Sequence, residues 1–69
     1  MEFHWENGCT LRVSAADGTA TISANREGLV SLANHLLSLA QESAGSHFHL
    51  DANNALEPGS AELIVEKVQ

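Results

Sequence analysis

The stretch LRVSAADGTATISA, residues 11–24, carries the clearest fold signal in the chain. Apolar and polar side chains alternate on both sides of Asp17-Gly18, and such alternation is typical of half-buried strands. An Asp-Gly pair favours a two-residue type I′ turn, in which both residues take positive φ. This turn would pair apolar residues on one face of the hairpin: Leu11 with Ala24, Val13 with Ile22, and Ala15 with Ala20. Turn chemistry and hydrophobic pattern therefore predict the same hairpin.

Residues 1–5 alternate in the same way and predict a further strand before this hairpin. A two-residue turn at Asn7-Gly8 would place Trp5 opposite a polar residue. A three-residue loop, 6–8, with Gly8 in the left-handed region as a bulge, pairs Trp5 with Cys9 instead. Because a slip of one residue moves every side chain to the other face, we predict the bulged loop. Trp5 is then the largest expected core residue.

Residues 26–43 change to the 3.6-residue period of an amphipathic helix. Asn25 suits the N-cap, Glu27 favours the positive end of the helix dipole, and Gly45 suits a left-handed stop. The apolar stripe consists of Leu29, Leu32, Ala33, Leu36, Leu39 and Ala40, widened by Val30 and Leu37. The opposite face, which we expect in water, carries Ser31, Asn34, His35, Ser38, Gln41 and Glu42.

Two more strands follow the helix, at residues 46–50 and 61–68, and a ten-residue loop with a Pro58-Gly59 turn joins them. The element order is therefore βββαββ. We predict an α+β two-layer sandwich, in which one mostly antiparallel five-stranded sheet carries a single helix on one face and meets water on the other. A chain of 69 residues has room for one core, so residues 1–69 form a single domain.

The net charge of −6 comes from nine acidic residues against three basic ones, Arg12, Arg26 and Lys67. Nucleic-acid binding requires clustered cations to neutralise phosphates, so this balance argues against it and favours a basic partner. Cys9 is the only cysteine, which excludes an internal disulfide and favours a reducing, cytoplasmic location. No apolar run is long enough to span a membrane, and no membrane partner is expected.

The stretch SHFHLD, residues 46–51, alternates polar and apolar side chains. With Phe48 and Leu50 buried beneath the helix, the polar residues must project from the open face of the sheet. On the last strand, Ile64 would stand among carboxylates on the same face, and an apolar centre with a polar rim is typical of a protein-binding patch. The predicted partner-binding residues are His4, His47, His49, Asp51, Glu62, Ile64 and Glu66.

Other interpretations of this face stay open at this point. It is also consistent with a solvated strand face, or with a homodimer formed through an exposed edge strand. Two imidazoles at i and i+2 suit a transition metal, but a structural zinc site takes four ligands, so we predict no metal site. No G-x-S-x-G, P-loop, H-E-x-x-H or C-x-x-C motif is present, and we predict neither an enzymatic activity nor a cofactor.

Several short motifs occur together in the second half of the chain. Glu-Gly-Leu begins the helix run REGLVSLANHLLSLA, and a His-x-His-Leu-Asp strand precedes Leu-Glu-x-Gly-Ser-x-Glu-Leu-Ile and a lysine in HFHLDANNALEPGSAELIVEK. Over roughly residues 20–67 the chain resembles the immunity protein 32 family of bacterial polymorphic-toxin systems. The resemblance implies a small cytoplasmic protein, made beside a toxin, that binds and neutralises that toxin. It assigns no binding residues.

Overall fold

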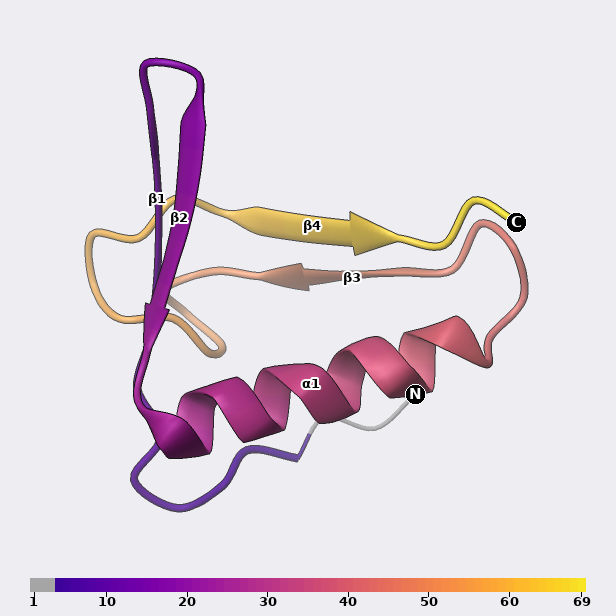
Figure 1. Cartoon of the computed structure of the whole chain (residues 1–69), viewed down its shortest axis with the longest axis horizontal. Helices are drawn as coiled ribbons and strands as arrows, with labels where there is room; N and C mark the ends of the chain where they lie inside the picture. The colour runs from indigo at the N-terminus through magenta and orange to yellow at the C-terminus, as the bar shows by residue number, and fades with distance from the viewer. Residues whose placement is uncertain (1–3) are drawn as a thin grey trace.

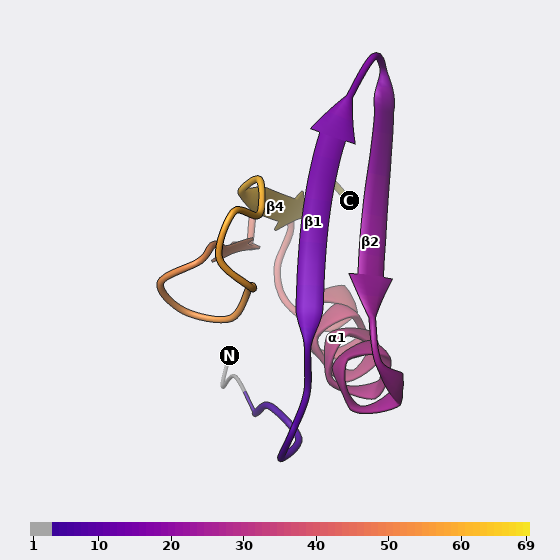
Figure 2. The same ribbon diagram turned by 90° about the vertical axis from the view of Figure 1, so that its left-hand side faces the viewer.

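The computed structural model describes residues 4–69, and these contain one helix and four strands (Figure 1). In chain order the elements are β1 (Leu11–Ala16), β2 (Thr19–Ala24), α1 (Arg26–Ala40), β3 (His47–Leu50) and β4 (Leu63–Glu66). The β1–β2 hairpin stands upright at one end of α1, while β3 and β4 lie above the helix and run roughly along it, away from the hairpin (Figure 1). Seen end-on, α1 lies at the foot of the hairpin (Figure 2).

The hairpin has the predicted register. Its Cα partners include Leu11 with Ala24, Val13 with Ile22, and Ala15 with Ala20. Asp17 and Gly18 both take positive φ, at 52° and 78°, as a type I′ turn requires. The local signal of an Asp-Gly turn between alternating residues was therefore sufficient to place this hairpin.

The predicted five-stranded sheet and the order βββαββ are wrong. The strands form two separate antiparallel sheets, β1–β2 and β3–β4, each with two strands. The outer edge of β1, where the first strand was expected, is occupied by the loop before β4. The N–H groups of Glu57 and Ala61 donate to the carbonyls of Leu11 and Val13, both at 2.8 Å. This loop closes the edge of β1 and joins the two sheets.

The residues expected to form the first strand do not form one where the structure describes them. His4 and Trp5 are irregular, and Met1, Glu2 and Phe3 lie outside the described residues. Residues 4–9, here called the N-terminal strap, run alongside α1 instead (Figure 1). A turn bonds the Cys9 N–H to the Glu6 carbonyl at 3.1 Å with Gly8 at φ 77°, so Gly8 is left-handed as predicted, without the strand pairing of Trp5 and Cys9.

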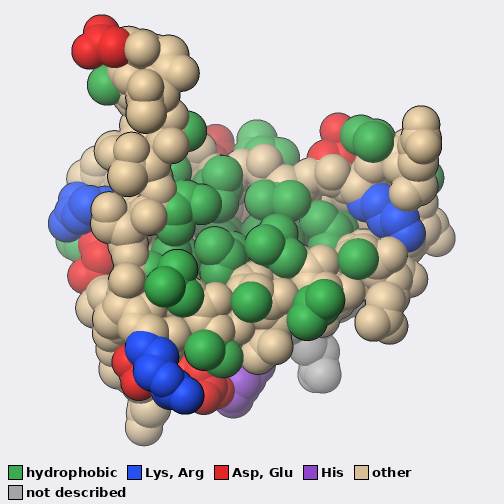
Figure 3. Space-filling view, in the orientation of Figure 1, with side chains coloured by type: hydrophobic (Ala, Val, Ile, Leu, Met, Phe, Trp, Pro, Cys, Tyr) green, Lys and Arg blue, Asp and Glu red, His purple; other side chains and the backbone are tan. Residues whose placement is uncertain are grey.

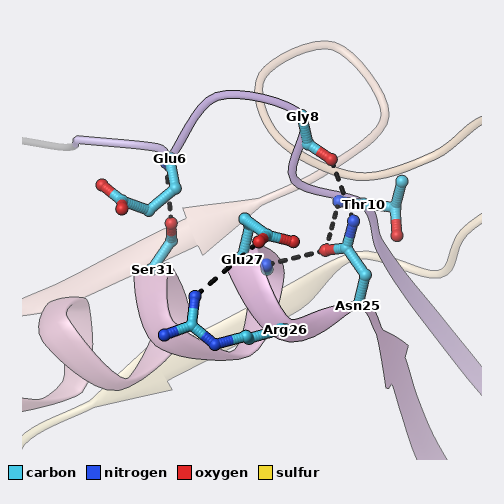
Figure 4. Close-up of polar contacts among 8 residues, drawn as sticks. Glu6, Gly8, Thr10, Asn25, Arg26, Glu27 and Ser31 are labelled. Carbon is cyan, nitrogen blue, oxygen red and sulfur yellow. Dashed lines mark hydrogen bonds and ion pairs between the residues drawn. The ribbon is translucent and has the colours of Figure 1, made fainter.

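Side chains of α1 supply the acceptors that a neighbouring strand would have supplied. The His4 N–H donates to His35 Nε2 at 3.1 Å. The Glu6 N–H donates to Ser31 Oγ at 2.8 Å, as Figure 4 shows. Four residues of helix and two residues of extended chain both span about 6 Å, so the two rows of groups match in spacing. Ser31 and His35 are 0% and 2% exposed, and our prediction that they face water is wrong.

Burial of these two polar residues sets the rotation of the helix. Its buried face consists of Gly28, Ser31, Leu32, His35 and Leu39. Three leucines of the predicted apolar stripe are consequently exposed: Leu29 at 52%, Leu36 at 42% and Leu37 at 63%. The prediction of an amphipathic helix was right, but only part of its predicted apolar face is covered.

Asn25 joins the start of α1 to the strap. As the predicted N-cap, its Oδ1 accepts from the Gly28 N–H at 2.8 Å and from the Thr10 N–H at 2.9 Å, while its Nδ2 donates to the Gly8 carbonyl at 2.9 Å (Figure 4). Gly28 lies so close to Thr10, the residue after the strap, that a Cβ at Gly28 would overlap the Thr10 carbonyl oxygen. The Asn25 side chain therefore fixes the helix start and the chain that crosses it.

The other end of α1 is shorter than predicted. The helix ends at Ala40, with Gln41 as C-cap, rather than at residue 43, and the left-handed Gly45 lies in the following loop. Lys67, just beyond β4, donates its ammonium to the carbonyls of Ala40 and Glu42, both at 2.7 Å. A cation at this position also favours the negative end of the helix dipole.

The core lies where the hairpin, α1, β3 and the 51–62 loop meet. Its buried members are Leu11, Val13, Leu32, Leu39, Phe48, Leu50 and Leu56. Phe48 and Leu50 are 2% and 1% exposed, as the alternation in residues 46–51 predicted. Trp5 packs against this core from the strap, with its ring 4.3 Å from the His35 ring, centroid to centroid, in an edge-to-face arrangement.

We predict that Gly28→Ala destabilises the protein although Ala favours helices by about 1 kcal/mol over Gly. The added methyl must displace the Thr10 carbonyl, and overpacking of this kind costs about 1–3 kcal/mol. Urea unfolding followed by circular dichroism measures the change. Asn34→Ala, at an exposed position of α1, is the control and should change stability by less than about 0.5 kcal/mol. Unaltered stability of the Gly28 variant would contradict the close approach.

We also predict that stability falls when the solution is acidified below about pH 6.5, the ordinary pKa of histidine. Burial lowers the pKa of His35, so the unfolded chain takes up this proton more readily than the folded one. The neutral His35 ring therefore contributes its full stabilisation above the pKa that His35 has in the unfolded chain. This contribution to the free energy of unfolding falls as the pH drops below that pKa. His35→Gln keeps an acceptor for the strap without a titrating ring, and its stability should vary less over this window. The control Asn34→Ala, at an exposed and non-titrating position of α1, should retain the wild-type slope.

Candidate protein-binding site

The outward side of β3–β4 gathers five of the seven predicted partner-binding residues. The strand register pairs His47 with Glu66 and His49 with Ile64, while the alternate pairs, such as Phe48 with Val65, face the core. Glu62 reaches the same side through its contact with His49. These residues are here called the outer face: His47, His49, Glu62, Ile64 and Glu66.

The outer face has an apolar centre and a polar rim. Ile64 is 54% exposed, and His49 beside it pairs with Glu62 through Nδ1 and Oε2 at 3.2 Å. The rings of His47 and His49 meet edge-to-face with centroids 4.9 Å apart. Because the His49–Glu62 pair is half exposed, it contributes little to stability, and its effect is to hold the imidazole in place.

The other two predicted residues do not join this face. Asp51 follows β3 and organises the next loop: its carbonyl accepts from Leu56 at 2.9 Å and its Oδ1 accepts from Asn53 at 2.9 Å. His4 lies on the strap, where its exposed ring pairs with Glu6 at 3.2 Å. Its placement on the sheet depended on a first strand that the described residues do not form.

A second surface was missed by the sequence analysis. The hairpin and α1 each bury some apolar side chains and leave neighbouring ones exposed. In the hairpin, Val13 is buried but its partner Ile22 is 43% exposed. On the helix, Leu32 is buried but Leu36 is 42% exposed. Leu63 and Val65 of β4 are likewise only partly buried, opposite buried residues of β3. Hydrophobic side chains gather in the hollow between the hairpin, α1 and β4 (Figure 3). We call this surface the apolar hollow and assign to it the exposed or partly buried apolar residues of these three elements: Ile22, Leu29, Leu36, Leu63 and Val65.

The sequence did contain a signal for the hollow, in the width of the apolar stripe on the helix. A helix that covers one core needs apolar residues on a single face. Here Leu29, Leu36 and Leu37 continue the apolar arc well past the buried Leu32 and Leu39. An arc of this width indicates two covered faces, and within residues 4–69 the chain itself covers only one of them.

Comparison with known families gives a match that begins at the start of β2. The family model for immunity protein 32 matches residues 19–68. The chain belongs to the immunity protein 32 family. Comparisons with curated proteins and with solved structures found no match. Membership confirms the resemblance in the helix and strand motifs and gives the chain a toxin-neutralising immunity role.

The part of the chain that matches immunity protein 32 contains β2, α1, β3 and β4. It therefore includes the whole outer face and every residue that lines the apolar hollow. The strap and β1 precede the match. Across residues 4–69, no helix combines the length and apolar character that crossing a bilayer requires.

The side chains that could bind a metal ion are not clustered in the part of the chain that the structure describes. Within residues 4–69, no three or more His, Cys, Asp or Glu side chains are grouped so that they could hold a metal ion. His47 and His49 offer two imidazoles, fewer than the ligands that a structural zinc site takes. Cys9, in the turn of the strap, is half-buried.

We predict that zinc does not raise the thermal unfolding temperature of this protein. A ligand that binds the folded state alone must stabilise it, and two imidazoles on an exposed strand bind zinc too weakly to do so at micromolar concentrations. Differential scanning fluorimetry with a slight excess of zinc measures the shift, and His47→Gln serves as the control. A rise in the wild type that the variant loses would establish a metal site at the outer face.

Proposed function

We propose that this chain neutralises its cognate toxin by binding it directly, without catalysis, in the cytoplasm, and that the outer face is the surface that binds. Membership of the immunity protein 32 family is the observation that carries the proposal. The choice of surface is supported by the register of β3 and β4, which puts Ile64 at the centre of an otherwise polar face. An exposed aliphatic residue with a polar rim suits the desolvated centre of an interface.

Charge supports a basic partner. The chain carries a net charge of −6, and Glu62 and Glu66 both flank Ile64 on the outer face. A toxin domain that acts on phosphates carries cationic groups around its own site, and an acidic surface would attract it over the range of the Debye length, about 8 to 10 Å. Charges on the rim of such an interface mainly change the association rate, while the apolar centre mainly changes the dissociation rate.

We expect Ile64→Lys to weaken binding to the toxin domain encoded beside this chain by at least about tenfold, or about 1.4 kcal/mol. The substitution puts a charge at the desolvated centre of the interface, and isothermal titration calorimetry measures the loss. Leu37→Lys, which replaces another exposed aliphatic residue on α1, is the matched control and should bind as the wild type does. Wild-type affinity of the Ile64 variant would refute the outer face as the binding surface.

We further expect the Glu62→Gln, Glu66→Gln double variant to associate more slowly and with a smaller dependence on salt, because two of the steering carboxylates are gone. Stopped-flow association rates at low and at physiological ionic strength measure both effects. The dissociation rate should change less than the association rate. An association rate for the wild type that does not vary with salt would remove the electrostatic argument for a basic partner.

A further inference from the structure

The β1–β2 hairpin has one closed edge and one open edge. In a hairpin with a two-residue turn, Ala16 and Thr19 form the hydrogen-bonded pair next to the turn, and alternate residues direct their backbone groups away from the partner strand. On β1 these groups are used: the carbonyls of Leu11 and Val13 accept from the 51–62 loop. On β2 the corresponding groups belong to Ala20 and Ile22. Among residues 4–69, no segment hydrogen-bonds to them.

The open edge has none of the features that usually protect an edge strand. The β2 sequence, TATISA, contains no charge, no proline and no glycine, and its Thr and Ile residues favour strands. Exposed edges with this composition readily pair with another strand. The hairpin also projects beyond the rest of the molecule, so the edge is accessible along its length (Figures 1 and 2).

The open edge and the apolar hollow adjoin each other. Ile22 directs its backbone groups to the edge and its side chain to the same face as its buried partner Val13, the face that looks into the hollow. A strand added to β2 would therefore extend the sheet and place its own alternate side chains over the hollow at the same time. A partner that pairs with β2 is therefore placed next to the apolar residues that α1 and β4 leave open.

We propose that a second copy of this chain occupies this site, with the two β2 strands paired antiparallel about a two-fold axis at Ile22. In this register Ile22 lies opposite the second copy's Ile22, and Ala20 lies opposite its Ala24. The axis is perpendicular to the hairpin sheet, so the two hairpins form one continuous sheet and their core-facing sides point the same way. The two hollows then open toward each other across the axis. Each copy offers the same surface, as a closed two-fold interface requires.

Charge at the ends of the paired strands supports this register. Asp17, at the exposed tip of each hairpin, comes beside the start of the second copy's α1, two residues beyond its β2. That helix start carries Arg26, Glu27 and the positive end of the helix dipole, and of these Arg26 and the dipole attract the Asp17 carboxylate. Arg26 pairs with Glu27 of its own chain at 3.7 Å through a largely exposed contact, which leaves it able to meet a second carboxylate.

A second copy fits the hollow better than a basic toxin does. The lining residues carry no charge, while the carboxylates of the outer face lie on the opposite side of the β3–β4 sheet. An exposed apolar surface of this kind promotes aggregation in a free protein, and the partner that is always present with the chain is another copy of it. The inference is independent of the proposed toxin-binding surface.

The test compares Ile22→Lys with Ile64→Lys, because both residues are half-exposed isoleucines at the middle of a strand. Light scattering coupled to size-exclusion chromatography measures the mass at about 100 μM. We expect the wild type and Ile64→Lys to have twice the mass of the chain, and Ile22→Lys to have the mass of one chain with unchanged circular dichroism. A monomeric wild type, or a dimeric Ile22→Lys, would overturn the proposal.

Cross-linking keeps the test decisive even where Ile22→Lys fails to fold. In a Cys9→Ser background, Ile22→Cys places two thiols across the proposed axis, within the separation that a disulfide can bridge. Mild oxidation should give a covalent dimer that a reductant dissolves, whereas Ile64→Cys in the same background should remain monomeric on a non-reducing gel. Equal cross-linking of both variants, or none at Ile22→Cys, would contradict the register. A monomeric wild type that loses toxin binding on Ile22→Lys would instead assign the hollow to the toxin.

Discussion

The arrangement of this protein depends on the hydrogen bonds between the N-terminal strap and α1. Ser31 and His35 lie one helical turn apart, and they accept from the N–H groups of Glu6 and His4. These donors are partly buried, and donors withdrawn from water need acceptors, which accounts for two polar helix positions facing inward rather than into water. The rotation of α1 about its axis follows from this constraint. Trp5, carried on the same strap, then packs its ring against His35.

The rotation of the helix determines which surfaces remain for partners. Turning Ser31 and His35 inward moves Leu29 and Leu36 to the edge of the core, where they line the apolar hollow with Ile22. The outer face arises separately, from the alternation along β3 and β4. One small fold thus presents a charged surface and an uncharged one on different sides, which suits two different kinds of contact.

Contacts between distant parts of the chain replace the extensive sheet that the sequence led us to expect. The 51–62 loop bonds to β1 and contributes Leu56 to the core, while Lys67 caps the far end of α1. These contacts compensate for the small core that a chain of 69 residues can form. Asp51, which was expected to contact a partner, has its carbonyl and carboxylate engaged in the turn that starts this loop.

The sequence by itself determined the features that depend on near neighbours. Asp17-Gly18 specified the hairpin and its register, Asn25 specified the helix start, and alternation specified that Phe48 and Leu50 are buried. Motifs in the helix and last strands also identified the family. Only the tertiary structure decided the number of sheets, the burial of His35 and the place of the hollow, of which the sequence showed no more than a wide apolar stripe on the helix. These depend on which distant segment packs against each element: the 51–62 loop, rather than a strand, bonds to the edge of β1, and the strap bonds to α1. No local pattern encodes such long-range pairings.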